Sequence, residues 1–380
     1  MDRQLYDKYS RQILFAPIGA QGQQRLMDSS AVLVGCGALG TSLANLMVRA
    51  GLGRLRIIDR DFVEESNLQR QTLFEESDAR EALPKAVAAQ RRLRAVNSSV
   101  AVEGVVADLT PGNAAELLSG FPLILDGTDN FETRYLVNDA AVSLGVPWIY
   151  GAVVASYGLT MTIRPGESAC LACLLESGDA RAAAGVEETC DTVGVLGAAV
   201  QVISAIQAAE ALKLLTGNAT SLHGRLISFD VWSARYQAIG VARRDDCRAC
   251  ARREFTYLSG QAQPHVTLCG RDSVQIHERS RQLDLPALRA RLAATLADVR
   301  ANEFLLRFRV PATAAAGQAA ARTGDADVAA AAGASPAAAR TAAGAIAGYE
   351  VTVFADGRAI VKGTRDPAVA RSLYARYLGA

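Results

Sequence analysis

Short apolar runs alternate with stretches of helical spacing along the first 150 residues of this 380-residue chain. Strands buried on both faces form continuous apolar runs, whereas amphipathic helices place an apolar residue every three or four positions. Strands that alternate with helices predict an α/β fold with a Rossmann-like, doubly wound sheet. The predicted strands are Ala31–Val34, Leu55–Ile58, Leu123–Leu125 and Trp148–Tyr150, and the predicted helices are Thr41–Ala50, Pro84–Val96 and Arg134–Leu144.

The region from residue 157 to 246 has a more mixed pattern, and its most apolar part runs from Val193 to Leu215. Gln201, Gln207 and Glu210 interrupt this part, so we expect a buried helix there and no membrane span. A last strand is predicted near Leu226–Phe229. The first 25 residues are polar and helical in pattern, without the apolar core of a signal peptide. These features predict a cytoplasmic protein that contacts no membrane.

Residues 262–380 have the pattern of a separate small α+β domain, which follows a first domain over residues 1–255. Asp356-Gly357 separates two apolar runs, as is typical of a β-hairpin. Residues 312–347 are dominated by alanine, which predicts a disordered insertion, with a plain alanine helix as the alternative. The expected strands are His265–Cys269, Val274–His277, Phe304–Val310, Glu350–Phe354 and Ala359–Val361, and the expected helices are Leu285–Leu296 and Val369–Leu378.

The charge balance narrows the range of partners. The chain has 40 basic and 39 acidic residues, so its net charge is +1. No broad positive field is available for nucleic acid or an anionic membrane surface. Seven cysteines in a chain of this length do not make a disulfide scaffold, and four of them fall in two Cys-x-x-Cys pairs. In a cytosolic protein such pairs indicate a metal site.

A glycine-rich loop follows the first predicted strand and leads into a helix. Glycine lets the backbone approach phosphate oxygens, and the helix N-terminus supplies free N–H groups. This context predicts nucleotide binding but does not separate NAD from ATP. Asp59 ends the second strand, where an acid can accept hydrogen bonds from ribose hydroxyls or serve only as a turn residue. The loop residues expected at the nucleotide are Gly35, Gly37, Ala38, Leu39 and Gly40.

A second set of side chains favours a triphosphate over a nicotinamide. Asp61, Asn67 and Arg70 follow the second strand, and Lys85 lies at a helix start, where the helix dipole disfavours a lysine. Arginine grips a phosphate through two donors, and lysine places a point charge on it. Such cations can stabilise charge that develops on a leaving pyrophosphate. Asp61, taken alone, fits a turn better than a ligand role.

Two aspartates lie at the carboxyl end of a further strand, in Asp126-Gly127-Thr128-Asp129-Asn130. Ligands of doubly wound sheets bind beyond this end of the strands. Hard carboxylate oxygens beside a triphosphate are what Mg²⁺ prefers, so Asp129 is the candidate for that ion. Asp126 could serve the same ion or simply brace the turn.

The two Cys-x-x-Cys pairs are separated by 73 residues. Four thiolates meet the tetrahedral demand of Zn²⁺ and leave no open position, so the predicted zinc site is structural. Redox-active pairs, the alternative, need a strand-to-helix placement that neither pair has. The predicted ligands are Cys170, Cys173, Cys247 and Cys250.

Cys190 stands apart from the pairs, after the Gly/Ala-rich stretch 178–185. A lone cysteine on such a loop could be a nucleophile. The neighbouring Glu187, Glu188 and Asp191 would raise the pKa of its thiol and oppose that role.

These motifs, taken together in order, resemble the ThiF/MoeB/HesA family, bacterial relatives of the ubiquitin-activating enzymes, over about the first 255 residues. The resemblance implies adenylation, with MgATP, of the C-terminal glycine of a small ubiquitin-like sulfur carrier that ends in Gly-Gly. The motifs are Tyr9-Ser10-Arg11-Gln12-Ile13, the glycine loop, Asp59-x-Asp61, Asn67-Leu68-Gln69-Arg70-Gln71, Pro84-Lys85, Thr128-Asp129-Asn130, the cysteine pairs and Thr189-Cys190.

The resemblance also implies roles for single residues. Arg11 matches an arginine that reaches the triphosphate from the other subunit, which implies a homodimer. Cys190 matches a cysteine that bonds to the carrier or its sulfur, and a separate donor such as a cysteine desulfurase or a rhodanese would supply that sulfur. Asp59 matches the ribose ligand of the family. The phosphate-binding and catalytic set is matched by Asn67, Arg70 and Lys85. Asp129, beside Asn130, matches the Mg²⁺-associated aspartate.

Three alternatives remain open at this point. An NAD-dependent oxidoreductase would explain the glycine loop but not Asn67, Arg70, Lys85 or Asp129. The second alternative is a non-catalytic protein that has a structural zinc site and only binds a ubiquitin-like partner. The third is adenylation of the carrier of molybdopterin synthase. The region from Cys269 to Asp272 and the hairpin at Asp356-Gly357 resemble the C-terminal extension of some ThiF proteins, and this resemblance favours the thiamin pathway.

Overall fold

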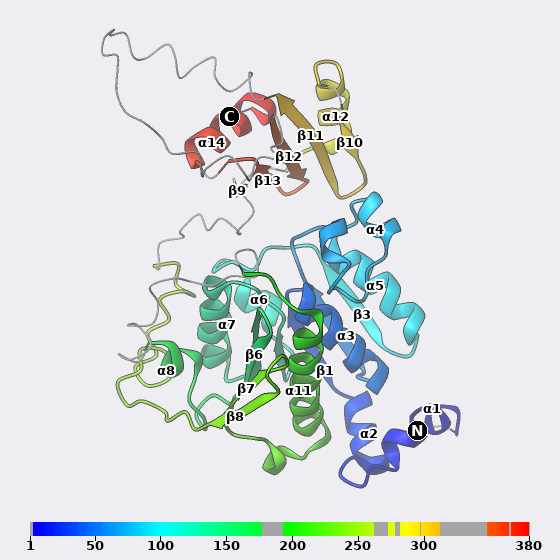
Figure 1. Ribbon diagram of the computed structural model, residues 1–380, viewed down its shortest axis with the longest axis vertical. Helices are drawn as coiled ribbons and strands as arrows, with labels where there is room; N and C mark the ends of the chain where they lie inside the picture. The colour runs from blue at the N-terminus through cyan, green and yellow to red at the C-terminus, as the bar shows by residue number, and fades with distance from the viewer. Residues whose placement is uncertain are drawn as a thin grey trace. The chain divides into compact units, whose positions relative to one another are not determined.

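The computed structural model describes residues 3–176, 193–261, 273–277, 282–296, 298–311, 348–364 and 366–379. The chain divides into two units, Met1–Gln263 and Pro264–Ala380 (Figure 1). Cys190, the predicted strand His265–Cys269 and the alanine-rich stretch 312–347 lie outside the described residues.

The first unit is built on an eight-stranded sheet with the order β3-β2-β1-β4-β5-β6-β7-β8. The first five strands in this order, β3, β2, β1, β4 and β5, are parallel to one another. The strands β6, β7 and β8 continue the sheet in antiparallel fashion. The predicted α/β fold is therefore confirmed as one with a large, parallel-rich sheet. The strands are β1 (Ser30–Val34), β2 (Arg54–Ile58), β3 (Ala101–Val105), β4 (Ile124–Asp126), β5 (Trp148–Val154), β6 (Tyr157–Ile163), β7 (Leu226–Asp230) and β8 (Arg235–Ile239).

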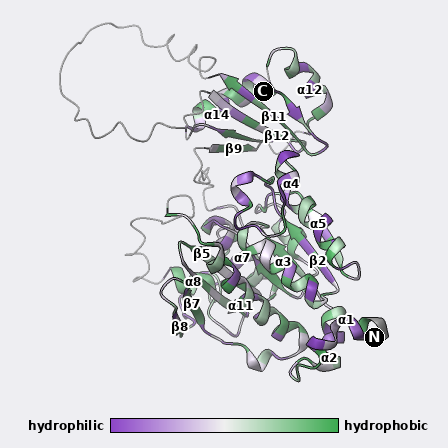
Figure 2. Ribbon diagram, turned by 45° about the vertical axis from the view of Figure 1, so that its right-hand side comes forward, coloured by the Kyte–Doolittle hydropathy of each residue, from purple (hydrophilic) through white to green (hydrophobic). Residues whose placement is uncertain are grey.

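Helices cover both faces of this sheet (Figure 1). One apolar core packs α3 (Ala38–Ala50), α5 (Lys85–Val96) and α11 (Gly197–Thr216) on the sheet. The other core packs α6 (Ala114–Leu118), α7 (Phe131–Leu144) and α8 (Leu171–Leu175) on the opposite face. Helix α4 (Glu76–Arg80) has no buried residue, and Figure 2 shows it as hydrophilic. The remaining elements are α1 (Arg3–Ile13), α2 (Gly19–Met27), η1 (Glu65–Asn67) and η2 (Ala219–Ser221).

Helix α11 is long and apolar enough, by length and composition, to cross a membrane, and half of its most apolar window is buried inside the protein. It packs against α3, β5 and β6, and buried Gln207 and Glu210 lie on it. These contacts are those of a core helix, as the interrupted apolar pattern predicts.

The second unit has a five-stranded antiparallel sheet with the order β10-β11-β12-β13-β9. Two helices pack with it around one apolar core. The predicted hairpin is confirmed: β12 pairs with β13 across a turn in which Gly357 has φ +83°. The elements are β9 (Ser273–His277), α12 (Leu285–Ala293), β10 (Arg300–Ala301), β11 (Leu305–Pro311), β12 (Gly348–Phe354), β13 (Arg358–Lys362) and α14 (Pro367–Leu378).

Candidate functional site

The glycine loop connects β1 to α3 and leaves the first turn of the helix without a side-chain cap. Gly35 and Gly40 are glycines because backbone lies against them: a Cβ at Gly35 would be 2.7 Å from the carbonyl of Gly127, and one at Gly40 would be 2.0 Å from Gly35 O. Gly37 is different, since the nearest atom to its Cβ would be 3.9 Å away, on Gln71. Space is thus available above Gly37, where uncapped N–H groups can meet an anion.

Asp59 lies directly behind this loop at the end of β2. One carboxylate oxygen accepts a hydrogen bond from the Cys36 N–H at 2.6 Å, and the other accepts one from the Asp61 N–H at 2.7 Å. Burial raises the pKa of Asp59 to about 6, helped by the charge of Asp61 and opposed by Lys85 and the two N–H donors. The carboxylate therefore braces the glycine loop and keeps further lone pairs for hydroxyl donors.

Lys85 is buried although it begins a helix, and its position has a clear structural cause. The segment around Phe62 pairs with the segment around Pro84, and Lys85 N–H donates to Asp61 O at 2.8 Å. The ammonium then lies 3.2 Å from a carboxylate oxygen of Asp61. Burial alone would lower the pKa of Lys85, but the charges of Asp61, Asp59 and Asp129 raise it above its usual value. Lys85 is thus held as a cation among three carboxylates. The carboxylate of Asp61 forms the direct ion pair with it.

The segment after β2 brings Asn67 and Gln71 into the same place. Asn67 is buried, and its Oδ1 accepts the Glu64 N–H at 3.1 Å, but its Nδ2 has no hydrogen-bond partner among the described residues. The same holds for Oε1 of Gln71, which is buried beside Gly37. Buried polar groups are usually satisfied, so unmet groups beside a glycine loop indicate a missing ligand. Gln71 was not among the residues predicted for the site.

Arg70 is half-buried, whereas Asn67 and Gln71 on the same segment are buried. Its guanidinium donates to Ser66 O at 2.8 Å, on the outer side of the same segment. The remaining guanidinium donors give this arginine the capacity to grip a phosphate as the sequence predicts.

The loop after β4 carries two aspartates with different surroundings. Asp126 is fully buried and accepts hydrogen bonds from Thr128 N–H at 2.9 Å and Thr128 Oγ1 at 2.7 Å, so it braces the turn. Asp129 is exposed, and its charge is close enough to Lys85 to raise the pKa of that lysine. Asn130 caps α7 by accepting the Thr133 N–H at 2.8 Å and donates to Asp129 at 3.4 Å. Of the two roles open to Asp126, the structure supports the brace.

The pocket residues fit a magnesium–nucleotide complex by their chemistry. Gly37 leaves space at a helix N-terminus, the Asn67 amide is an unmet donor, and Lys85 is a fixed cation. Asp129 offers an exposed carboxylate, the kind of oxygen that Mg²⁺ binds.

Four cysteines meet at a second place in the first unit, between α8 and the segment after β8. Their sulfur atoms all lie within 4.8 Å of one another, with separations of 3.9 Å (Cys170–Cys173), 3.6 Å (Cys170–Cys247) and 3.4 Å (Cys173–Cys250). Sulfurs that surround Zn²⁺ at about 2.3 Å in a tetrahedron are roughly 3.8 Å apart. The cluster therefore matches the size of a four-cysteine zinc site, and it is far too open for disulfides.

The protonation pattern of the cluster suits a metal. Hydrogen bonds from Cys170 hold the pKa of Cys173 near 4, while burial raises the pKa of Cys250 to about 11. One thiolate is thus already favoured, and a divalent cation would favour the others in the same way.

Comparison with known proteins identifies the family. The ThiF family matches residues 9–249. The chain belongs to the ThiF family. It is 42% identical over 376 residues to the "Sulfur carrier protein ThiS adenylyltransferase" of Bacillus subtilis, covering 98% of this chain and 99% of that protein. It is also 39% identical over 249 residues to the "Sulfur carrier protein adenylyltransferase" of Thermus thermophilus, covering 64% of this chain and 90% of that one.

A solved structure has the same fold as this ThiF-family chain. MccB of E. coli, crystallised with ATP, aligns with a TM-score of 0.55 and 22% identity over 64% of this chain and 74% of that one. The family match over residues 9–249 and the 42% identity to the Bacillus subtilis protein confirm the family resemblance drawn from the sequence motifs.

Among the predicted residues of this ThiF-family chain that the structure describes, Arg11 lies away from the glycine loop. It is exposed in the last turn of α1, and neighbouring Gln12 donates to Ala50 O at 2.9 Å, at the far end of α3. Helix α3 has 13 residues, so this end lies roughly 20 Å from the glycine loop. Arg11 cannot reach the pocket of its own protomer.

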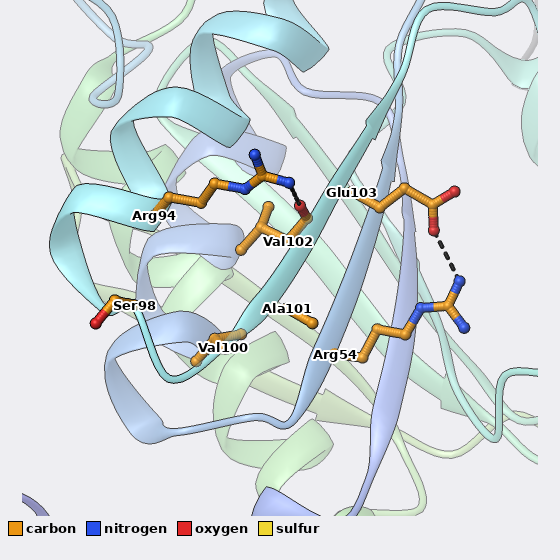
Figure 3. Close-up of a pocket in the computed structure, with 7 residues that line it drawn as sticks. All are labelled: Arg54, Arg94, Ser98, Val100, Ala101, Val102 and Glu103. Atoms are coloured by element: carbon orange, nitrogen blue, oxygen red, sulfur yellow. Dashed lines mark hydrogen bonds and ion pairs between the residues drawn. The ribbon is translucent and has the colours of Figure 1, made fainter.

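A cavity of about 480 Å³ lies beside the edge strand β3, and it is not the nucleotide pocket (Figure 3). Arg94 on its wall donates to Val102 O at 3.1 Å, and Arg54 bonds Glu103 at 2.8 Å. Arg54 and Ala101 begin their strands, so the cavity lies toward the amino ends, away from the glycine loop. The candidate nucleotide site of this ThiF-family chain is thus at the opposite end of the sheet.

Proposed function

We propose that this protein uses ATP to adenylate the C-terminal glycine carboxylate of a ubiquitin-like sulfur-carrier protein. The observation that carries this is the buried cation Lys85 among Asp59, Asp61 and Asp129, beside an unmet Asn67 amide at a glycine loop. A relative that matches over nearly the whole chain is a sulfur-carrier adenylyltransferase. An NAD-dependent oxidoreductase has no use for this set of phosphate-binding groups.

The reaction needs positioning more than acid–base chemistry. The carrier carboxylate is already ionised, so it can attack the α-phosphorus in line while the bond to pyrophosphate breaks. The products are the acyl-adenylate and pyrophosphate. Lys85 and Arg70 stabilise the charge on the departing phosphates, and Asn67 donates to a phosphate oxygen. Bound Mg²⁺ would neutralise part of the triphosphate charge, and Asp129 is the residue that would hold it.

The ribose and the loop have separate anchors. Asp59 accepts hydrogen bonds from the ribose hydroxyls while it braces Cys36. The N–H groups of Gly37, Ala38, Leu39 and Gly40 face the phosphates, with Asn130 holding Asp129 in place.

We infer that the enzyme is a homodimer in which Arg11 of each protomer enters the pocket of the other. Arg11 lies away from the glycine loop of its own chain, and exposed Leu14 (69%) and Phe15 (61%) lie three and four residues after it. Exposed large apolar side chains beside a functional cation indicate a contact surface.

The zinc, the sulfur step and the pathway complete the proposal. Zn²⁺ at the cysteine cluster has a structural role because all four positions are filled by thiolates. The persulfide sulfur of a separate donor, such as a cysteine desulfurase or a rhodanese, then attacks the acyl-adenylate and displaces AMP, which joins carrier and donor in an acyl disulfide. Cys190 bonds to the carrier by displacing AMP itself, or to its sulfur by exchanging into this disulfide and releasing the donor thiol. The match over the whole Bacillus subtilis protein favours thiamin thiazole synthesis over the molybdopterin pathway. A cytoplasmic location fits these partners.

Pyrophosphate exchange into ATP tests the proposal directly. Zinc-loaded full-length protein is incubated with labelled pyrophosphate, MgATP and a carrier that ends in Gly-Gly. We expect exchange that depends on the carrier and disappears when its last glycine is removed. Absence of exchange with both thiamin-type and molybdopterin-type carriers would refute adenylation. Carrier binding that persists without exchange, and that survives Lys85→Met, would instead support a protein that only binds the carrier.

A further inference from the structure

A buried pair of charges lies behind the loop that carries Asp129. Arg134 on α7 and Asp126 at the end of β4 approach to 3.6 Å, with side-chain exposures of 6% and 0%. Burying two charges is costly even when they are paired. Such a pair calls for an explanation, and neither residue touches the groups assigned to the nucleotide.

The hydrogen bonds of this pair end on two neighbouring pieces of backbone. Arg134 Nη2 donates to Thr128 O at 2.6 Å and to Gly151 O at 3.1 Å. Asp126 accepts from Thr128 at 2.7 and 2.9 Å and from Gly151 N–H at 3.3 Å. The pair thus fastens the residue next to Asp129 onto strand β5.

The opposite side of the same backbone is fixed from α11. Gln207 Nε2 donates to Asp126 O at 2.9 Å and to Ile149 O at 3.3 Å. A Cβ at Gly151 would lie 2.4 Å from Gln207 Nε2, so the strand and the amide are in close contact. The base of the loop is therefore held between two helices, and Asp129 lies beyond it with its side chain exposed.

Stability of α7 does not explain Arg134. The guanidinium lies in the first turns of the helix, where the helix dipole disfavours a cation. Asn130 already supplies the N-terminal cap. Arg134 also lies over the rings of Phe131 and Tyr150, at 5.4 and 5.5 Å from their centroids, which leaves little freedom to its side chain.

We propose that Arg134, together with Asp126, is a positioning residue that holds Asp129 toward Lys85 and so sets the affinity of the pocket for the divalent cation of the metal–nucleotide complex. This inference rests on the proposed function, because it assumes that the pocket takes ATP. Replacing Arg134 removes the donor to Thr128 O and leaves the Asp126 carboxylate buried without its cation. The loop then relaxes, and Asp129 no longer meets the metal in one fixed place.

The test compares nucleotide binding with and without metal. Arg134→Lys, Arg134→Gln and the double variant Asp126→Asn/Arg134→Gln are titrated with ATP by calorimetry in Mg²⁺ and in EDTA, and the Mg²⁺ dependence of pyrophosphate exchange is measured. The double variant removes both charges, so it leaves no unpaired buried ion if Arg134→Gln fails to fold. We expect the Mg²⁺ concentration for half-maximal exchange to rise about tenfold, as for other residues that orient metal ligands. Affinity for ATP in EDTA should stay within about twofold of wild type.

Arg248→Lys is the matched control. Arg248 is a half-buried arginine that likewise pairs with a fully buried carboxylate of α7, Asp139, at 2.9 Å, but it lies at the cysteine cluster. It should leave the Mg²⁺ dependence unchanged in protein that retains its zinc.

Three results would overturn the inference: an unchanged Mg²⁺ dependence in the folded Arg134 variants, an equal loss of ATP affinity in Mg²⁺ and in EDTA, or the same shift in Arg248→Lys. If wild-type protein shows no exchange, the proposed function fails instead, and the calorimetric comparison still decides the role of Arg134.

Discussion

The nucleotide pocket and the cysteine cluster belong to the same unit but are built in opposite ways. In the pocket, Lys85 is shared among three carboxylates, and buried donor and acceptor groups of Asn67 and Gln71 have no partner among the described residues. In the cluster, four thiols meet one another within 4.8 Å, and nothing is left open for a substrate.

This difference separates a site that binds a ligand from a site that stabilises the fold. A site that must take and release a ligand leaves polar groups unmet, at a cost in stability. A site that holds segments together closes its coordination and adds to stability. Replacing a pocket residue should thus affect catalysis more than folding, whereas replacing a cluster residue should do the reverse.

The largest effect is expected for Cys247→Ser. Structural zinc sites have apparent binding free energies of about 10 kcal/mol or more, so we expect loss of zinc and a Tm lower by at least roughly 10 °C. Metal analysis and thermal denaturation measure both. Cys36→Ser, a buried thiol far from the cluster in sequence and packing, is the control and should retain zinc. A stable Cys247→Ser protein with full zinc would contradict the comparison.

Lys85→Met should have a smaller free-energy effect, confined to catalysis. Loss of one preorganised cation at a reacting phosphate costs about 10²- to 10³-fold in rate, or about 3–4 kcal/mol. Pyrophosphate exchange should fall by this factor while zinc content stays full. Lys213→Met, which breaks the ion pair with buried Glu210 at 2.6 Å outside the pocket, serves as control. Equal losses of exchange in the two variants would remove the distinction between pocket and support.

The smallest effect concerns pH and Asp59. Its pKa of about 6 in the folded protein lies above the unfolded value, so its contribution to stability is present below pH 4 and lost as the pH rises through 6. This amounts to about 3 kcal/mol, and Asp59→Asn should remove that slope from the unfolding free energy. Denaturant unfolding between pH 4 and 7 measures it.

Asp230→Asn provides the comparison of opposite sign. Hydrogen bonds from Ser233 and Ser156 lower the pKa of half-buried Asp230, so its contribution is present at neutral pH and lost as the pH falls. A wild-type slope that survives Asp59→Asn would show that the charge at the pocket does not strain the fold.

The sequence predicted the central strands of the first unit well and its edges poorly. The runs at β1, β2, β4 and β5 are apolar because neighbours cover them, and that burial leaves a readable pattern. The edge strands β3 and β8 escaped prediction, as did β10, since an edge strand has one neighbour and keeps polar residues such as Glu103 and Arg235.

The same limit applies to the site. Asp59, Lys85 and Asp129 could be predicted because strand ends and a helix start mark them along the chain. Gln71, Arg134 and Gln207 could not, because their roles come from contacts between segments far apart in sequence. Asp61 pairs with Lys85 at 3.2 Å, a contact that its place in the sequence could not reveal.

The backbone contact between Gly35 and Gly127 ties the loops after β1 and β4 together. The Gly35 N–H donates to Ile58 O and the Gly127 N–H donates to Val34 O, both at 2.8 Å, with no side chain between the two loops. The Gly127 amide can exchange only when its bond to the end of β1 opens, so its protection follows the local stability of the segment that carries the β1 loop. Amide deuteration at the β4 loop would therefore slow whenever a ligand settles on the β1 loop, even if it never touches Gly127.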